Sequence, residues 1–327
     1  MKIGIVTVTF NSASVLDDFF TSIEQQDYSD FNLYIIDNNS VDDTLSKVDN
    51  WDFKSKVLLK NTNNLGVAAG NNQGIKLALK DGCYFVLLLN NDTVFEAKLL
   101  SKLVQTYNSY GSSIVVPKMN YFSPSNMIWY AGGFYNRKKA FLNFHRGQGE
   151  IDNNQYNVDD KIEYAPTCCT LIHQSVFEDI GLMDEKFFVY FDDTDFFFRV
   201  LKDGKQEARY RHDIHFLHKI GSLTNSRNKD KPMKYGEFFI KQNSKNHVYF
   251  LRKQKTLIAY INLVYLWFYL TIRFFISHRF EKNGVSFTLY KRPILKDLKC
   301  NNESKYIYCR RPKSRNHFLA PLSQSAY

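Results

Sequence analysis

The feature that most constrains the fold is the alternation of short apolar runs with helix-patterned segments over the first 90 residues. Runs rich in β-branched and apolar residues stand at 3–10, 31–36, 56–59 and 84–89. Residues 14–25, between the first two runs, carry apolar side chains at helical spacing. This rhythm is typical of parallel βαβ units. We therefore predict an α/β fold with a mixed, mainly parallel sheet flanked by helices.

Polar side chains follow the predicted strands, at the sheet edge where α/β folds bind their ligands. The first strand leads into Thr9 and Asn11, and the second leads into Asp37 and Asn39. An aspartate that ends a strand can accept a hydrogen bond from a ribose hydroxyl or a base N–H. It can equally serve only its own turn, as Asx residues often do. The residues alone leave both interpretations open.

Residues 61–74 contain Gly66, Gly70 and Gly74 at four-residue spacing. On a helix this spacing forms one small-residue face, which suits either close packing on the sheet or the approach of a ligand. The spacing differs from the Gly-x-Gly-x-x-Gly of dinucleotide-binding proteins and from the lysine-bearing phosphate loop. The sequence therefore argues against a dehydrogenase or a P-loop NTPase.

The fourth predicted strand is apolar and leads directly into Asn90, Asn91 and Asp92. A carboxylate in this position is costly unless it has a partner. Mg²⁺ or Mn²⁺ would be a natural partner, because hard cations take carboxylate oxygens and keep water and substrate phosphates as further ligands. The alternative is that Asp92 caps a following helix.

Three aspartates, Asp192, Asp193 and Asp195, stand among aromatic residues. Apolar surroundings and like-charged neighbours raise the pKa of a carboxyl group, which suits a general base. Helix capping and an ion pair with Arg199 are the alternative for one or two of these acids. Further along the chain, His218 could ligate a metal through its neutral imidazole, although a single such histidine is more often structural.

Charge divides the chain unevenly. Residues 241–327 hold 17 Lys and Arg against 3 Asp and Glu, a net charge of +14, whereas residues 1–240 have a net charge of −4. Nucleic-acid-binding signatures are absent from the sequence, so anionic lipid is the favoured partner of the basic region. Residues 257–276 form an apolar run rich in Tyr and Trp, interrupted by polar residues. We favour an amphipathic interfacial helix over a membrane span or a buried core helix.

Taken together and in this order, these segments resemble glycosyltransferase family 2 of the GT-A fold, especially its bacterial rhamnosyltransferase-like members of surface-polysaccharide pathways. The resemblance covers roughly residues 1–255. It rests on six motifs: Thr-Phe-Asn, Ile-Asp-Asn-Asn-Ser-x-Asp-Asp-Thr, Asn-Leu-Gly-x-Ala-x-Gly-Asn-Asn, Leu-Asn-Asn-Asp-Thr, Phe-Asp-Asp-Thr-Asp and His-x-x-Gly-Ser.

The resemblance implies a role for each group of site residues. Asp193, with Asp192 beside it, would deprotonate the acceptor hydroxyl, and Asp92 with His218 would hold Mg²⁺ or Mn²⁺. Asparagines occupy the first two positions of the usual acidic triplet, so we expect modest metal affinity. The implied nucleotide and donor residues are Thr9, Asn11, Asp37, Asn39, Asn64, Gly66, Asn71, Asn90 and Asn91.

The implied reaction is a single in-line displacement that inverts the anomeric carbon. It would transfer rhamnose or a hexose from a nucleotide-diphosphate sugar to a glycan or lipid-linked oligosaccharide, as in O-antigen, lipopolysaccharide or capsule biosynthesis. The alternative is a non-catalytic, membrane-associated protein of the same fold that binds nucleotide sugars or glycans.

The same reasoning predicts the domain organisation. Residues 1–240 would form the GT-A domain, with a donor half (1–120) and an acceptor half (121–240), and residues 241–327 a helical membrane-associated extension. The N-terminal run lacks the basic start and cleavage site of a signal peptide. We therefore expect a cytoplasmic protein, peripherally associated with the inner face of the cell membrane.

Overall fold

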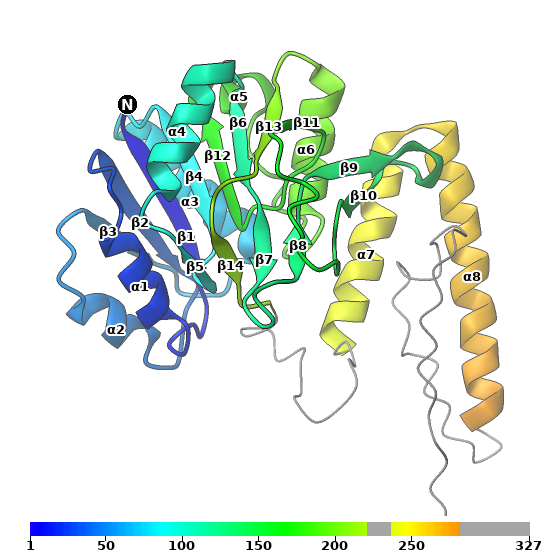
Figure 1. Cartoon of the computed structure of the whole chain (residues 1–327). Helices are drawn as coiled ribbons and strands as arrows, with labels where there is room; N and C mark the ends of the chain where they lie inside the picture. Colours follow the sequence, from blue (N-terminus) through cyan, green and yellow to red (C-terminus); the bar gives the residue numbers. More distant parts are fainter. Residues whose placement is uncertain (221–236, 282–327) are drawn as a thin grey trace, which may run out of the picture. The chain divides into compact units, whose positions relative to one another are not determined.

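The computed structural model describes residues 1–220 and 237–281, and its first part follows the predicted alternation (Figure 1). The elements are β1 (Ile3–Thr9), α1 (Leu16–Glu24), β2 (Phe31–Asp37), α2 (Thr44–Asn50), β3 (Lys56–Lys60), α3 (Val67–Lys80) and β4 (Phe85–Leu89). The four predicted strands and the predicted first helix are thereby confirmed.

One large sheet forms the centre of the fold. Its eight strands have the order β11-β13-β6-β12-β4-β1-β2-β3, and β1 pairs in parallel with both β2 and β4. Strand β12 lies antiparallel between β4 and β6, so the sheet is mixed but mainly parallel, as predicted. The further strands are β6 (Ile114–Pro117), β11 (Asp160–Ile162), β12 (Cys169–His173) and β13 (Ala208–Arg211).

A smaller four-stranded sheet, with the order β5-β14-β7-β8, lies beyond the end of β4. Strand β14 runs antiparallel to β5, and this register sets His218 opposite Thr93. Thr93 and His218, more than 120 positions apart in the chain, therefore lie side by side just beyond the end of β4. The strands are β5 (Thr93–Phe95), β7 (Met119–Tyr121), β8 (Ile128–Tyr130) and β14 (Phe216–His218).

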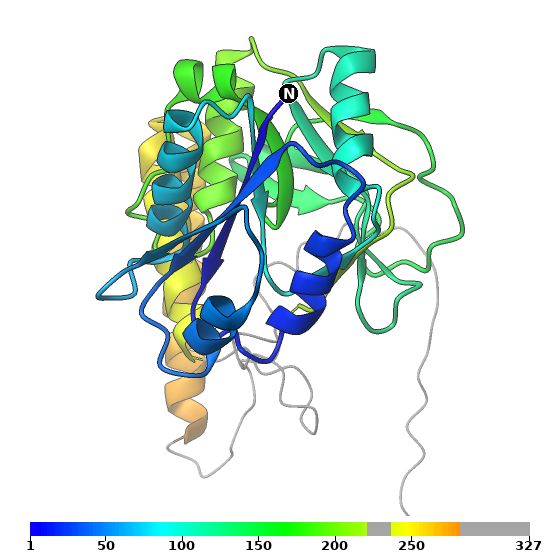
Figure 2. The same cartoon turned by 90° about the vertical axis from the view of Figure 1, so that its left-hand side faces the viewer.

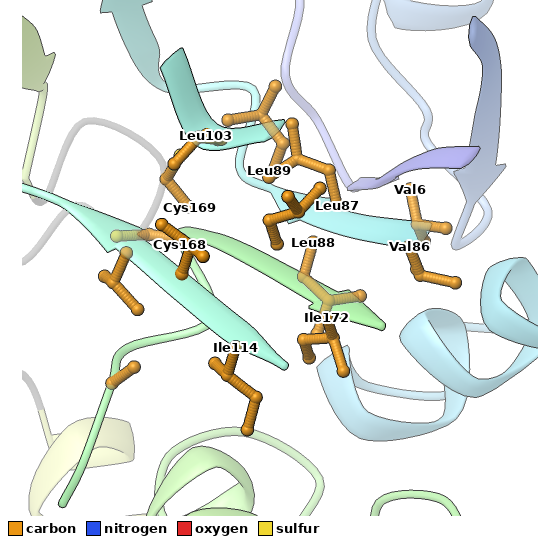
Figure 3. Packing of buried hydrophobic residues seen from close by; sticks show 14 of the residues in the cluster. Val6, Val86, Leu87, Leu88, Leu89, Leu103, Ile114, Cys168, Cys169 and Ile172 are labelled. Atoms are coloured by element: carbon orange, nitrogen blue, oxygen red, sulfur yellow. The ribbon is translucent and has the colours of Figure 1, made fainter. Parts of the chain in front are cut away.

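The core is built on β4, all of whose side chains are buried. Figure 3 shows Leu88 beside Ile172 of the neighbouring β12, with Leu87 and Leu89 on the other side of β4. Helix α3 covers one face of the sheet, and α1 and α4 (Leu99–Tyr110) lie on the other side (Figure 2). A Cβ at Gly74 would collide with Val6 of β1, so close packing explains this glycine of the four-residue repeat.

Two helices belong to the second half of the α/β body. Helix α5 (Gln174–Ile180) follows β12, and α6 (Asp192–Asp203) begins at the aspartate cluster. Gly204 ends α6 in the left-handed conformation that favours glycine at this position. A two-stranded hairpin, β9 (Gly133–Asn136) and β10 (Leu142–His145), encloses the short 3-10 helix η1 (Arg137–Lys139).

Helix α7 (Glu237–Gln254) packs against the α/β body through Asn246 and Phe250, both buried. The domain boundary that we predict between residues 240 and 241 falls inside this continuous helix. The split into donor and acceptor halves stays a prediction. Residues 282–327 of the predicted extension lie outside the described residues.

Helix α8 (Leu257–Glu281) packs on α7 through Leu251, Ala259 and Leu266. Its opposite face differs from the amphipathic pattern that we expected, because apolar side chains occupy it as well. The exposed apolar residues are Leu257, Tyr260, Ile261, Val264, Tyr265, Trp267, Phe268 and Ile272. In the part of the chain that the structure describes, neither α8 nor any other helix meets the length and hydropathy needed to cross a membrane.

Candidate active site

The ends of β1 and β2 are joined by hydrogen bonds at the carboxyl edge of the large sheet. Strand pairing sets Thr9 opposite Asp37, and the Thr9 hydroxyl donates to the Asp37 carboxylate at 2.8 Å. Asp37 is buried and also accepts from the backbone N–H and the hydroxyl of Ser40, at 2.9 and 2.6 Å. The local turn that we considered for Asp37 is therefore present, and its binding of a nucleoside stays a prediction.

Asn11 and Asn39 both adopt left-handed backbone conformations, which asparagine tolerates better than most residues. The Asn11 side chain accepts a hydrogen bond from the Val41 N–H at 2.9 Å, and the Asn11 N–H donates to the Ser40 hydroxyl. The loops after β1 and β2 thus form one unit. Asn39 is exposed at its edge and can reach a ligand without breaking these bonds.

The start of α3 and the residues before it contact the segment around residues 183–188. Asn64 accepts from the Gly66 N–H at 2.9 Å, and Asn71 is buried with its amide 3.9 Å from the Met183 sulfur. A Cβ at Gly66 would collide with the carbonyl oxygen of Phe188. The close approach of the Phe188 backbone therefore requires glycine at position 66. The spacing of the glycines in the sequence could not distinguish this reason from the approach of a ligand.

Asp92 and His218 are brought together by the pairing of β5 with β14. Their side chains, each about nine-tenths buried, lie 3.3 Å apart between the Asp92 Oδ1 and His218 Nε2 atoms. A strand follows Asp92, so the helix-capping alternative is wrong. Asn90 is half-buried beside it, and Asn91 is buried and donates to the Val8 carbonyl oxygen at 2.9 Å.

The chemistry of this pair fits a divalent cation. Carboxylate oxygen and imidazole nitrogen are both metal donors, and the His218 Nδ1 atom has no hydrogen-bond partner among the described residues. Within residues 1–220 and 237–281, no group of three or more His, Cys, Asp and Glu side chains is arranged to hold a metal. Two protein ligands would leave the other positions to water and donor phosphates, as Mg²⁺ usually requires.

Asp192 and Asp193 begin α6, where the positive end of the helix dipole favours negative charge. Asp193 is half-buried and accepts hydrogen bonds from the Tyr164 hydroxyl at 2.6 Å and the Thr194 N–H at 2.6 Å. Burial raises the pKa of Asp193, although these hydrogen bonds act in the opposite direction. Burial and the charge of Asp193 raise the pKa of Asp192 to about 8.

Three aromatic rings connect the Asp92–His218 pair with the two aspartates. Trp129 meets the His218 ring edge-on at 4.6 Å and the His145 ring at 4.9 Å. His145 in turn stacks on Tyr164, 5.7 Å between ring centroids, and burial lowers the pKa of His145 to about 4. We call Trp129, His145 and Tyr164 the aromatic wall. Sequence reasoning missed all three. Trp129 lies in β8, His145 ends β10 and Tyr164 follows β11, and none of these segments carries a motif.

Asp195 and His212 have structural partners. Asp195 is buried and pairs with Arg199 at 3.0 Å, which confirms the ion-pair alternative for one of the three aspartates. The His212 ring pairs with Asp159 at 2.6 Å. Gly221 and Ser222, which complete the last motif, lie outside the described residues.

Comparisons with known proteins identify the family of this chain. A model of the family described as "Glycosyl transferase family 2" matches residues 4–181, more than half of the chain. The chain belongs to glycosyltransferase family 2. The matched range includes every donor-side residue named above and Asp92, whereas Asp192, Asp193 and His218 follow it.

Two curated relatives work in glycan biosynthesis. This family 2 chain is 27% identical over 144 residues to the low-salt glycan biosynthesis hexosyltransferase Agl10 of Haloferax volcanii, covering 43% of this chain and 45% of the relative. It is 32% identical over 110 residues to the GalNAc(5)-diNAcBac-PP-undecaprenol beta-1,3-glucosyltransferase of Campylobacter jejuni, covering 33% of this chain and 35% of the relative. The chain thus matches less than half the length of either relative.

Solved structures show the fold. TarS of S. aureus superposes with a TM-score of 0.54 at 14% identity, covering 77% of this chain and 39% of TarS. GalNAc-T7, solved with UDP, GalNAc and Mn²⁺, superposes with a TM-score of 0.53 at 12% identity, covering 67% of this chain and 44% of that protein. These similarities confirm the predicted GT-A architecture of this family 2 chain.

Proposed function

We propose that this protein is an inverting glycosyltransferase that moves rhamnose or a hexose from a nucleotide-diphosphate sugar to a glycan or lipid-linked acceptor. The observation that carries the proposal is that one row of aromatic rings connects two polar sites. The Asp92–His218 pair suits a diphosphate with its cation, the Asp192–Asp193 pair suits a general base, and the aromatic wall connects them.

In this proposal Asp193 removes the proton from the attacking acceptor hydroxyl. Tyr164 and Thr194 each donate a hydrogen bond to its carboxylate, which fixes the direction of its lone pairs. The acceptor oxygen then bonds to the anomeric carbon while the bond from that carbon to the diphosphate oxygen breaks on the opposite face. One displacement without a covalent intermediate inverts the configuration. Burial and the charge of Asp193 raise the pKa of Asp192 to about 8, so Asp192 is protonated near neutral pH and the negative charge of the pair stays on Asp193.

The donor site would be formed by the carboxyl ends of β1, β2 and β4. Asp37 and the loop asparagines Asn11 and Asn39 would recognise the nucleoside, with Asn64, Gly66, Asn71, Asn90 and Asn91 around the sugar diphosphate. Mg²⁺ or Mn²⁺ bound by Asp92 and His218 would supply positive charge to the departing diphosphate. TarS has been solved with UDP-GlcNAc, with a TM-score of 0.51 at 15% identity over 80% of this chain and 69% of that chain. Uridine donors are therefore the first class to test.

The acceptor is proposed to lie at a membrane surface. The Campylobacter relative is named for an undecaprenol-linked substrate. The exposed face of α8 carries aromatic and aliphatic side chains, including Tyr260, Tyr265 and Trp267, and the region from residue 241 onward has a net charge of +14. Tyr and Trp favour the headgroup boundary, and Lys and Arg attract anionic lipid. We propose peripheral attachment to the inner face of the cell membrane, in polysaccharide biosynthesis of the O-antigen or capsule type.

The test is nucleotide release by the purified full chain across a panel of UDP-, dTDP- and GDP-sugars, with Mg²⁺ or Mn²⁺ and then with EDTA. Metal-dependent release from one donor, increased by a glycan acceptor, is the expected result. Donor binding without release from any member of the panel would favour the non-catalytic binding protein.

A further inference from the structure

Two residues just before the catalytic aspartates have unusual backbone conformations. Tyr190 and Phe191 both have positive φ, 66° and 67°, which bulky residues seldom adopt. Such a conformation is energetically costly for a bulky residue and persists only where its surroundings hold it. The next two residues are Asp192 and Asp193, so this turn determines where both carboxylates lie.

The backbone of this turn is bound from two sides. On the donor side, the Val67 N–H at the start of α3 donates to the Phe188 carbonyl oxygen at 2.6 Å, next to the glycine that allows the close approach. On the other side, the Asn246 amide of α7 donates to two successive carbonyl oxygens, of Val189 at 2.8 Å and Tyr190 at 2.7 Å. Three consecutive carbonyls are therefore held by elements far apart in the sequence.

Asn246 is well placed to hold the turn rigidly. It is 1% exposed, so water does not compete for its hydrogen bonds. Its side-chain oxygen accepts from the Gln242 amide at 3.2 Å, which orients the Asn246 NH₂ group toward the turn. His247 stacks on the Phe191 ring with centroids 5.5 Å apart, and Phe250 packs against the same ring.

We infer that Asn246 is a positioning residue for the proposed reaction, and that α7 clamps the turn which aims Asp192 and Asp193 at the acceptor. The inference rests on the proposed function and adds a component that no motif of the α/β domain contains. A misplacement of about 1 Å at a reacting group can lower the rate about 100-fold, so the clamp matters for turnover more than for donor binding.

The test compares Asn246→Ala and Asn246→Asp with the matched controls Asn243→Ala and Asn243→Asp. Asn243 lies on the same helix and binds only the Phe239 carbonyl oxygen one turn away. Each full-length variant is assayed for kcat and donor KM, and amide hydrogen exchange is followed in peptides covering residues 187–195 and β4. The control Asn243→Asp adds the same negative charge to α7 as Asn246→Asp does. The control Asn243→Ala removes a side-chain amide from the same helix, as Asn246→Ala does.

We expect both Asn246 variants to lose about 10- to 100-fold in kcat with donor KM within about twofold. Exchange in residues 187–195 should be faster, while β4 keeps its protection. Asn246 variants that turn over like the Asn243 controls would overturn the inference, as would equal acceleration of exchange in β4, which indicates general loss of stability. A wild-type chain that transfers no sugar refutes the proposed function instead, and the exchange comparison still decides whether Asn246 holds the turn.

Discussion

The two halves of the candidate site are built in different ways. At the donor edge, the loops that follow two adjacent strands are joined by hydrogen bonds, such as those among Thr9, Asp37 and Ser40. The acid segment depends on remote parts of the chain, with Tyr164 on one side and Asn246 of α7 on the other. The comparison teaches that donor binding and turnover should respond to different substitutions. The loops after β1 and β2 are preorganised by their own hydrogen bonds, whereas the proposed base is positioned by other elements.

The largest effect is expected from Asp193→Asn, which removes the proposed base but keeps its size. We expect kcat to fall about 10³-fold, within the range typical of general-base loss, while donor affinity changes less than about twofold. Single-turnover kinetics and calorimetric titration of the donor measure the two quantities. An equal loss of donor binding would make Asp193 a structural residue and remove the distinction between the two halves.

Substitution on the metal side should have a smaller effect, with a different signature. Asp92→Asn should lower kcat/KM about 10- to 100-fold and raise the Mn²⁺ concentration needed for half-maximal activity. Asp195→Asn serves as a control for loss of a buried carboxylate, because Asp195 pairs with Arg199. Unchanged metal dependence in Asp92→Asn would remove Asp92 from the cation site.

Tyr164→Phe sharpens the comparison, because it removes only the hydroxyl that donates to Asp193. We expect kcat to fall about 10-fold, since the loss of one hydrogen bond to a charged group is worth about 1.5–3 kcal/mol. Donor KM should stay constant. The matched control is Tyr135→Phe. The Tyr135 hydroxyl donates to the Thr194 carbonyl oxygen and not to a carboxylate. Equal kinetic effects of both substitutions would count against a specific role for Tyr164.

Stability should depend on pH through Asp192. The pKa of Asp192 is raised from 3.8 to about 8 in the folded chain, so the folded chain binds this proton more tightly than the unfolded chain does. The contribution of Asp192 to the free energy of unfolding is therefore complete below pH 4 and is lost as pH rises toward 8. Asp192→Asn removes this loss. Because one pKa unit corresponds to about 1.4 kcal/mol, we expect the variant to be more stable than wild type by about 5 kcal/mol at pH 8 and nearly equal to it at pH 4. Urea unfolding at the two pH values measures the difference. A destabilised Asp192→Asn at pH 8 would show that the carboxylate is favourably bound.

The smallest effect on catalysis is expected at α8. Tyr260→Ser, Tyr265→Ser and Phe268→Ser, combined in one chain, should reduce co-sedimentation with anionic vesicles while leaving turnover of a water-soluble acceptor within about twofold. All three residues are more than half exposed, so the fold should tolerate the change. Undiminished vesicle binding would place membrane attachment elsewhere in the chain.

The sequence predicted those features that depend on local pattern. Strands β1 to β4 and the candidate residues at their carboxyl ends follow from apolar runs with polar residues after them. Asp193 and His218 were named from motifs. The pairing of His218 with Asp92 was expected only through family resemblance, since it requires the antiparallel register of β14 on β5.

The rest could not be predicted because it depends on contacts between distant segments. Tyr164 reaches Asp193 across 29 positions, and Asn246 reaches Tyr190 across 56. Neither belongs to a motif with a chemical meaning of its own. The glycine repeat has mixed causes, since Gly74 packs on Val6 whereas Gly66 makes room for the Phe188 carbonyl.

The most direct test of the account is the anomeric configuration of the first product, followed by proton NMR from the start of the reaction. A base at Asp193 and a single displacement predict a product with configuration opposite to that of the donor sugar. Retention of the donor configuration would contradict the proposed mechanism and the assignment of Asp193 as its base.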